Sequence, residues 1–371
     1  RDWIDQGNLR ADAAVLYRSN AQSRVLEEGL INAGIPYRVY GGLRFFERAE
    51  IKDALAYLRL ISHRDDDSSF ERIVNKPTRG IGARTVEIMR SYARANSCSM
   101  WRAAGAVASD ELNGRAANAV LAFINLIEKL ARETAGLDLQ EQVDHIIHAS
   151  GLIEFFKKDK GEKGETRVEN LLELVSAARS FEPDPAEEMS PLDEVLSHAA
   201  LEAGEGQADA WEDCVQLMTM HSAKGLEFPL VFLSGMEDGL FPHQRSIADP
   251  NGLEEERRLC YVGITRAKQT LYVTYAEQRR LHGMDNYSQP SRFIAEIPDE
   301  YVEEVRPRVQ VTRPVRSGSR GSKATTASSE LGIRLGQRVR HGKFGDGVIL
   351  NCEGQGAHAR VEVNFETAGT K

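Results

Sequence analysis

The segment Val215-Gln-Leu-Met-Thr-Met220 opens a series of three short apolar runs that decides the fold. Pro229-Leu-Val-Phe-Leu-Ser234 and Leu271-Tyr-Val-Thr-Tyr275 follow it, and helical or turn-forming residues separate the three runs. Apolar runs of this length, spaced by helical segments, are typical of buried strands in a parallel sheet. Residues 214–305 are therefore predicted to be α/β.

The first 41 residues show the same pattern. Residues 11–17 form another short apolar run, and Ser19 or Asn20 can cap the helix that follows it. From residue 51 to about residue 210, nearly every segment indicates helix or loop. Apolar residues at helical spacing predict the buried side of the first helix: Val25, Leu26, Leu30 and Ile31.

The simplest architecture is an α/β domain split in sequence, residues 1–41 plus 214–305, around a mostly α-helical inserted domain, residues 42–213. Residues 306–329 contain six Lys or Arg residues and no acid among many Ser, Thr and Gly residues. Residues 306–330 are therefore predicted to be a flexible basic linker. Short alternating segments around a Gly-rich turn in residues 331–371 predict a small SH3-like β-barrel.

Composition limits the possible functions. The 371 residues are 41% hydrophobic and 28% charged, and the formal net charge is -9, so any binding of nucleic acid must come from local sites. The four cysteines are scattered, and neither they nor the histidines predict a metal site. No apolar run approaches the roughly 20 residues that span a bilayer, so we expect a cytoplasmic protein without a membrane partner.

Arg266 is the first candidate for chemistry. It lies at the end of a predicted helix, residues 254–268, just before the last predicted strand. There its planar, permanently charged guanidinium can bridge two phosphate oxygens across a cleft. The alternative is a surface arginine paired with one of the three glutamates of residues 254–256, and the helix taken alone favours this alternative.

The segment Thr219-Met-His-Ser-Ala-Lys-Gly-Leu-Glu-Phe-Pro229 is the second candidate. We expect its polar groups to cluster at the carboxyl end of a strand, where open α/β sheets bind ligands. Thr219 and His221 can donate to phosphates or sugars, and Glu227 can accept from a ribose hydroxyl pair. A capped turn with a solvated lysine is an equally consistent alternative. The glycines do not match a Gly-x4-Gly-Lys-Ser/Thr loop.

The third candidate is Pro77-Thr-Arg-Gly-Ile-Gly-Ala-Arg-Thr-Val86. Two glycines around one isoleucine, at the start of a helix, expose backbone N–H groups that can hold a phosphate without reading its base. Arg79, Arg84 and Thr85 are expected to add contacts. An ordinary Gly-rich turn is the alternative.

Two further segments, Tyr17-Arg-Ser-Asn20 and Arg44-Phe-Phe-Glu-Arg48, combine aromatic and cationic side chains. This combination suits stacking on the bases of a single strand and holding its phosphates. Packing of the rings in the core is the commoner alternative for such residues.

Together these segments resemble the UvrD/PcrA/Rep group of superfamily 1 DNA helicases. The motifs are long and specific, and the resemblance spans essentially the whole chain. They are Tyr17-Arg-Ser-Asn-Ala-Gln-Ser-Arg24, Tyr40-Gly-Gly-Leu-Arg-Phe-Phe-Glu-Arg48, Arg79-Gly-Ile-Gly82, the segment from Thr219 to Pro229, and Glu254-Glu-Glu-Arg-Arg-Leu-Cys-Tyr-Val-Gly-Ile-Thr-Arg-Ala267.

The resemblance implies a RecA-like motor domain (2A) split by a helical domain (2B), followed by a Tudor-like module. It implies ATP as the cofactor, with Arg266 as a catalytic group on the terminal phosphate and Glu227 on the ribose. The positions that match contacts to single-stranded DNA are Arg18, Asn20, Thr219 and His221. Those that match contacts to duplex DNA are Lys52, Gly80, Ile81, Gly82 and Thr85.

The resemblance further implies a 3′–5′ DNA helicase of DNA repair that acts on single strands and single-strand/duplex junctions. RNA polymerase and mismatch or excision repair proteins are the implied partners. The chain supplies neither the family's phosphate-binding loop nor a strand ending in the Asp-Glu pair that holds Mg²⁺. We therefore expect a fragment of a longer enzyme, cut before the 2A domain and within the last barrel, and inactive by itself.

Two other functions remain open. A non-catalytic DNA- and partner-binding module would explain why this chain has no means of hydrolysing ATP. A component of a helicase–nuclease complex is the other, although no nuclease-like acidic cluster follows residues 214–305, whereas a Tudor-like module does.

Overall fold

The computed structural model describes residues 1–112, 114–159, 161–186, 189–204, 212–281 and 284–305, together with four strands between residues 338 and 370. The chain divides into two compact units, Arg1–Glu303 and Glu304–Lys371. The predicted linker, residues 306–330, lies outside the described residues. In the part of the chain that is described, no helix has the length and apolar character needed to cross a membrane.

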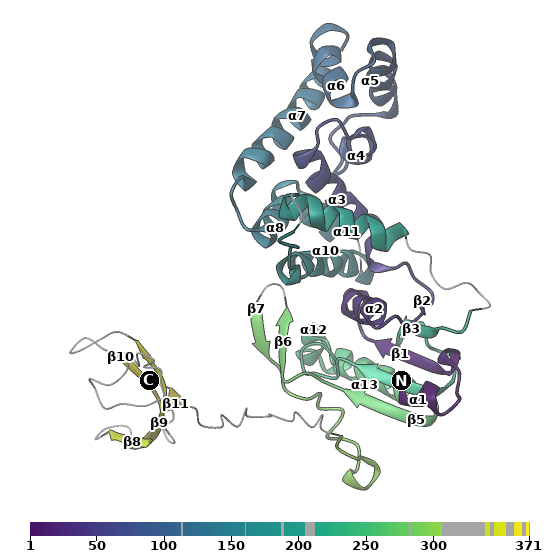
Figure 1. The fold of residues 1–371 in the computed structure, drawn as a ribbon, viewed down its shortest axis with the longest axis vertical. Coiled ribbons are helices and arrows are strands. Elements are labelled where there is room, and N and C mark those ends of the chain that lie inside the picture. The colour runs from purple at the N-terminus through teal and green to yellow at the C-terminus, as the bar shows by residue number, and fades with distance from the viewer. Residues whose placement is uncertain are drawn as a thin grey trace, which may run out of the picture. The chain divides into compact units, whose positions relative to one another are not determined.

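A five-stranded parallel sheet forms the centre of the α/β part of the first unit (Figure 1). It contains strands from both ends of the unit, with β1 in the middle and the order β2-β3-β1-β4-β5. The predicted α/β class and the split of the sheet by a helical insertion are therefore confirmed. The strands are β1 (Ala13–Tyr17), β2 (Tyr37–Val39), β3 (Val215–Thr219), β4 (Phe228–Ser234) and β5 (Ala267–Thr274).

Helices α2 (Ser23–Asn32) and α13 (Pro250–Ile264) cover opposite faces of this sheet. Side chains alternate along β1, so that Tyr17 packs with the α2 side and Leu16 with the α13 side. The predicted buried side of α2 is correct for Leu26, Leu30 and Ile31, which pack against the sheet. It is wrong for Val25, which is 52% exposed.

The insertion is built of helices around an apolar core that is separate from the cores of the sheet. Phe70 and Phe123 lie in this core, where their rings meet edge to face at 5.5 Å. The boundaries after residues 41 and 213 stay predictions. The helices are α3 (Ala49–Ser62), α4 (Asp67–Ile73), α5 (Ala83–Asn96), α6 (Met100–Asp110), α7 (Gly114–Thr134), α8 (Leu139–Ala149), α9 (Leu152–Lys157), α10 (Glu162–Ser180) and α11 (Pro191–Gly204).

The last helix and strand of the sheet domain begin and end earlier than predicted. Helix α13 ends at Ile264 and β5 begins at Ala267, because the N–H of Phe228 bonds the carbonyl of Arg266 (2.8 Å) and starts strand pairing there. Strands β2, β6 and β7 were not predicted. The remaining elements are α1 (Asp2–Asp5), η1 (Arg10–Asp12), η2 (Asn20–Gln22), η3 (Phe45–Glu47), α12 (Gln244–Ile247), β6 (Gln278–Leu281), β7 (Met284–Tyr287) and η4 (Asp299–Tyr301).

The second unit contains a four-stranded antiparallel sheet with the order β11-β10-β9-β8. Each strand pairs with its neighbour in sequence, and the sheet lies within the residues predicted to form a small SH3-like module. The pairing of β9 with β10 shifts register between Glu362 and Val363. The strands are β8 (Arg338–His341), β9 (Gly345–Glu353), β10 (Arg360–Phe365) and β11 (Gly369–Thr370).

Candidate functional site

Glu227 and Arg266 lie side by side at one edge of the parallel sheet. Glu227 directly precedes β4 and Arg266 directly precedes β5, and these strands are parallel neighbours. Both residues therefore lie at the edge formed by the amino ends of the strands. The side chain of Glu227 is 57% exposed, and its carboxylate lies 3.6 Å from Nζ of Lys268.

Main-chain oxygens and one hydroxyl hold the half-buried guanidinium of Arg266. Nε donates to the carbonyl of Val262 (2.9 Å), Nη1 to the carbonyl of Leu226 (2.8 Å), and Nη2 to Oγ1 of Thr265 (3.0 Å). These bonds place the charge between the last turn of α13 and the residue before Glu227. A guanidinium has five N–H donors, so the three bonds do not exhaust its capacity for an anion.

The alternative role of Arg266, an ion pair with residues 254–256, is wrong. The carboxylates of these residues point to other cations. Each glutamate pairs with a different arginine: Glu254 with Arg257, Glu255 with Arg258, and Glu256 with Arg18.

The candidates for single-stranded DNA lie at the opposite edge of the sheet. Strands β1 and β3 end at Tyr17 and Thr219, which are register partners, so the residues after them are neighbours. The exposed His221 belongs to this group. The prediction that Glu227 clusters with Thr219 and His221 at a carboxyl end is wrong, because residues 220–227 cross to the amino end of β4.

Arg18 is held by a carboxylate of α13. Its Nε lies 2.9 and 3.1 Å from the two oxygens of Glu256, and its Nη2 lies 2.7 Å from Oε1. The Glu256 side chain is only 5% exposed, and it also accepts from the N–H of His243 (3.2 Å). Since α13 also accepts from Arg266 in its last turn, this helix contacts candidate residues of both edges.

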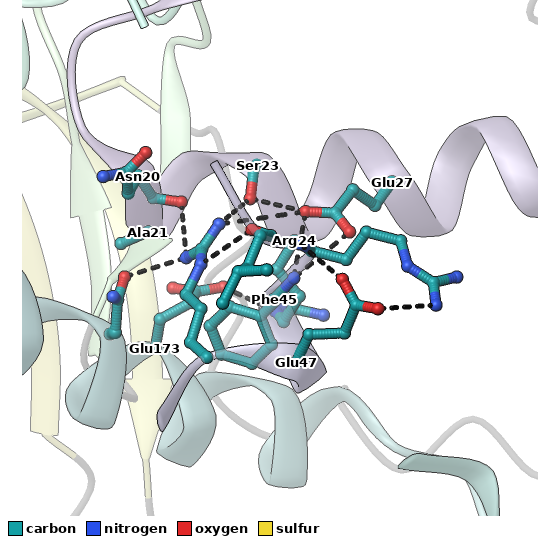
Figure 2. A network of polar contacts seen from close by, with 12 residues as sticks. Asn20, Ala21, Ser23, Arg24, Glu27, Phe45, Glu47 and Glu173 are labelled. Carbon is teal, nitrogen blue, oxygen red and sulfur yellow. Dashed lines mark hydrogen bonds and ion pairs between the residues drawn. The ribbon is translucent and has the colours of Figure 1, made fainter. Parts of the chain in front are cut away.

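A polar network joins the segment after β1 to the helical insertion (Figure 2). Arg48 donates from Nη1 to the carbonyl of Asn20 (2.9 Å) and to Oδ1 of Asn170 (2.9 Å), and from Nη2 to Oγ of Ser23 (2.5 Å). The sequence alone does not reveal this network, because Asn170 is 122 residues from Arg48. The only available signal was the arginine-rich motif of residues 44–48.

Glu169 makes a second connection between the same parts. Its Oε2 accepts from Oγ of Ser19 (2.5 Å), and its Oε1 lies 3.4 Å from Nε2 of His243. Burial raises the pKa of Glu169, but the hydrogen bonds from His243 and Ser19 outweigh burial and hold that pKa below its usual value. Arg48 thus links the carbonyl of Asn20 to Asn170, and Glu169 accepts from Ser19. The segment that contains Arg18 and Asn20 is therefore connected to α10 at two adjacent residues.

The aromatic and cationic residues near these segments belong to the core. The rings of Tyr17 and Phe45 are 0% and 1% exposed. The side chains of Arg44 and Arg48 are 7% and 8% exposed, and Arg48 lies over the ring of Phe45. Core packing, rather than stacking on bases, is the role these positions have in the structure.

All the candidates for duplex DNA except Lys52 lie at or just before the start of α5. Gly80, with φ of +82°, and Gly82 are exposed, whereas the side chain of Ile81 is 1% exposed and packs in the helical core. Thr85 is half-buried in the first turn. No side chain caps α5 and its first turn contains no acid, so the amino end of the helix presents uncompensated positive charge.

Arg79 and Lys52, two further candidates for contact with DNA, differ in their availability. The prediction that Arg79 adds a contact to a phosphate is wrong. Its guanidinium turns inward and donates to the carbonyls of Pro77 (3.0 Å) and Ser150 (3.2 Å). Lys52 is exposed in the first turn of α3. It stands next to Asp53, whose carboxylate pairs with Arg72 and Lys76.

Comparison with known proteins decides the family. Residues 2–278 match the UvrD-like helicase C-terminal domain, and residues 335–371 match the PcrA/UvrD tudor domain. The chain belongs to the UvrD-like helicase family. The parallel sheet with its helical insertion is accordingly the RecA-like part of a UvrD-like helicase, and the antiparallel sheet of the second unit belongs to its tudor domain.

Curated helicases are similar to all or nearly all of the chain. DNA helicase II of Salmonella typhimurium and that of Escherichia coli are each 56% identical over 373 residues, which cover 100% of this chain and 52% of the relative. ATP-dependent DNA helicase PcrA of Bacillus subtilis is 41% identical over 96% of this chain and 50% of its own length. The chain thus spans about half the length of the curated relatives it matches.

Proposed function

We propose that the chain is the carboxyl-terminal half of an ATP-dependent 3′–5′ DNA helicase that translocates on single-stranded DNA and unwinds duplex in DNA repair. The observation that carries this proposal is the adjacency of Arg266 and Glu227 at the amino edge of the sheet. A guanidinium beside a carboxylate suits a terminal phosphate and a ribose, respectively. The direction of travel rests on the family alone.

In this proposal one wall of the ATP site lies in this chain. Arg266 would use its remaining donors on the terminal phosphate, and Glu227 would accept from the ribose hydroxyls. ATP, bound with Mg²⁺ whose ligands are expected outside this chain, supplies the free energy that hydrolysis releases. The chain contains no Gly-x4-Gly-Lys-Ser/Thr loop, so we expect it not to hydrolyse ATP by itself.

The opposite edge would hold DNA. Arg18, Asn20, Thr219 and His221 would contact a single strand, while Lys52 and the Gly80–Thr85 segment would contact the duplex ahead of it. Closure of the nucleotide site would be transmitted to the DNA strand through α13, because that helix accepts from Arg266 in its last turn and from Arg18 near its middle. We also propose a cytoplasmic location, with RNA polymerase and excision or mismatch repair proteins as candidate partners of the tudor domain.

The test joins this chain to the other half of a relative. In E. coli DNA helicase II whose matching half is replaced by this chain, Arg266→Ala should lower ATP hydrolysis about a thousandfold, because a phosphate-binding arginine is worth that much in phosphoryl transfer. Binding of single-stranded DNA should persist. Arg102→Ala, at a side chain 70% exposed in the insertion, is the matched control and should leave both activities near normal.

The outcomes separate the candidate functions. Near-normal turnover by the Arg266→Ala protein would refute the role of this arginine. A chimera that binds DNA tightly but hydrolyses no ATP, although the original helicase does so in parallel, would favour the non-catalytic DNA- and partner-binding module.

A further inference from the structure

Asn75 precedes the candidate duplex-binding loop and bonds directly to its backbone. Its Oδ1 accepts from the N–H of Arg79 (2.8 Å) and from the N–H of Ile81 (3.2 Å). Both partners are N–H donors, so the oxygen of the amide must face the loop. One side-chain atom thus closes the turn on both sides of Gly80.

The side chains of Arg79 and Ile81 anchor the two ends of this turn, whereas the backbone around Gly80, at its tip, is bonded to Asn75. Arg79 is anchored inward on main-chain carbonyls, and the side chain of Ile81 is buried. Gly80 lies between them with φ of +82°, a conformation that glycine adopts freely. Apart from the residues adjacent in the chain, no atom lies within 4 Å of a Cβ built at Gly80 or at Gly82, so side chains from elsewhere in the chain do not support the tip.

We propose that Asn75 is a positioning residue for duplex DNA. By taking the N–H groups of Arg79 and Ile81, it fixes the turn so that Gly80, Gly82 and the uncapped first turn of α5 face outward as one phosphate-binding surface. Asn75 itself contacts no DNA. This inference rests on the proposed function of the loop.

The consequence for affinity follows from the two hydrogen bonds. Without them the loop samples other conformations, and binding must first order it. Asn75→Ala should weaken binding to single-strand/duplex junctions about tenfold, which corresponds to about 1.4 kcal/mol, while binding to single strands is unchanged. Asn75→Asp retains an oxygen acceptor and should restore junction affinity to within about threefold of the original.

The experiment uses the full 371-residue chain and two readouts. Hydrogen exchange measures protection of the N–H groups of Arg79 and Ile81, and fluorescence anisotropy measures binding to a labelled junction and to a labelled single strand. Asn96→Ala is the control, because this asparagine lies at the end of α5 and its amide donates only locally, to the carbonyl of Tyr92 (3.0 Å). Gly82→Val tests the proposed contact itself, since it adds bulk at the exposed tip.

The expected result is loss of protection and of junction affinity in Asn75→Ala, with both kept in Asn75→Asp and Asn96→Ala. Retained protection in Asn75→Ala would overturn the inference. So would lost protection with unchanged junction affinity while Gly82→Val binds junctions poorly. If Gly82→Val binds junctions normally as well, the loop is not the duplex contact, and the proposed function of this segment fails together with the inference.

Discussion

Glu27 is a buried carboxyl group of the polar network, with 4% of its surface exposed. It accepts from Oγ of Ser23 (2.6 Å) and from the N–H of Phe45 (3.2 Å), as Figure 2 shows. Burial raises the pKa of Glu27, although the hydrogen bond from Ser23 and the charge of Arg48 act in the opposite direction. The folded protein therefore holds a proton on Glu27 more tightly than the unfolded chain does.

This raised pKa predicts a pH dependence of stability. The contribution of Glu27 to the free energy of unfolding is fully present below its ordinary pKa of 4.5 and is lost as pH rises through the raised pKa of the folded state. The unfolding free energy of the original protein minus that of Glu27→Gln, from urea titrations between about pH 4 and pH 7, should fall as pH rises. A tenfold tighter hold on the proton in the folded state corresponds to a fall of about 1.4 kcal/mol.

Asp238 provides a control of opposite sign. Burial alone would raise the pKa of Asp238, but bonds from the side chain and N–H of Arg292 hold the pKa below its usual range. Its contribution is present above the ordinary pKa of 3.8 and is lost as pH falls through the lowered one. The same difference for Asp238→Asn, with the urea titrations extended below pH 3.8, should rise with pH. A flat or rising difference for Glu27→Gln would contradict the burial argument.

At the scale of the helix, two glycines allow the effect of intrinsic helix propensity on stability to be distinguished from the effect of packing. Gly164 lies in the first turn of α10, where a Cβ would come within 2.4 Å of the carbonyl of Asp159 and 2.7 Å of that of Phe156. Gly29 lies exposed in α2, and apart from the adjacent residues and nearby backbone of the helix itself, a Cβ there would meet no atom within 4 Å. Intrinsic propensity favours alanine equally at both positions.

We expect Gly164→Ala to lower the free energy of unfolding by about 1–3 kcal/mol, because backbone carbonyls cannot move aside as a flexible side chain can. Gly29→Ala should raise it by about 0.5–1 kcal/mol. Urea unfolding of the two variants measures both values. Stabilisation by Gly164→Ala would mean that the turn before α10 has room for a methyl group.

At the scale of the whole first unit, the sheet and the insertion meet through polar side chains. Their apolar cores are separate clusters, and the contacts between them include Arg24 of α2 with Glu173 of α10 at 2.7 Å, with side chains 10% and 14% exposed. Polar interfaces of this kind allow domains to move relative to each other more readily than apolar ones.

A double-mutant cycle on Arg24 and Glu173 tests how much this contact contributes. Because the pair is partly buried and charge-assisted, we expect a coupling energy of about 1–2 kcal/mol in the free energy of unfolding. The control cycle uses Arg258 and Glu255, both 73% exposed on α13, where we expect no more than about 0.5 kcal/mol. Equal couplings in the two cycles would rule out a special role for the buried pair.

The short apolar runs and the ordered motifs determined the fold class by themselves. Strands buried on both faces must be apolar along their length, so the runs at residues 11–17, 215–220 and 229–234 predicted β1, β3 and β4 within two residues. Strand β2, only three residues long, and the hairpin of β6 and β7 left no comparable signal. The motifs also identified the family, because their residue types and spacing are local properties of the chain.

Only the tertiary structure decided which candidate residues share an edge. In the parallel sheet, residues 220–227 cross from the carboxyl end of one strand to the amino end of another, which separates Glu227 from Thr219 and places it beside Arg266. The pairing of Arg18 with Glu256 joins residues 238 positions apart. Local sequence patterns contain no information about such partners, because burial and charge pairing at this distance depend on how the chain folds as a whole.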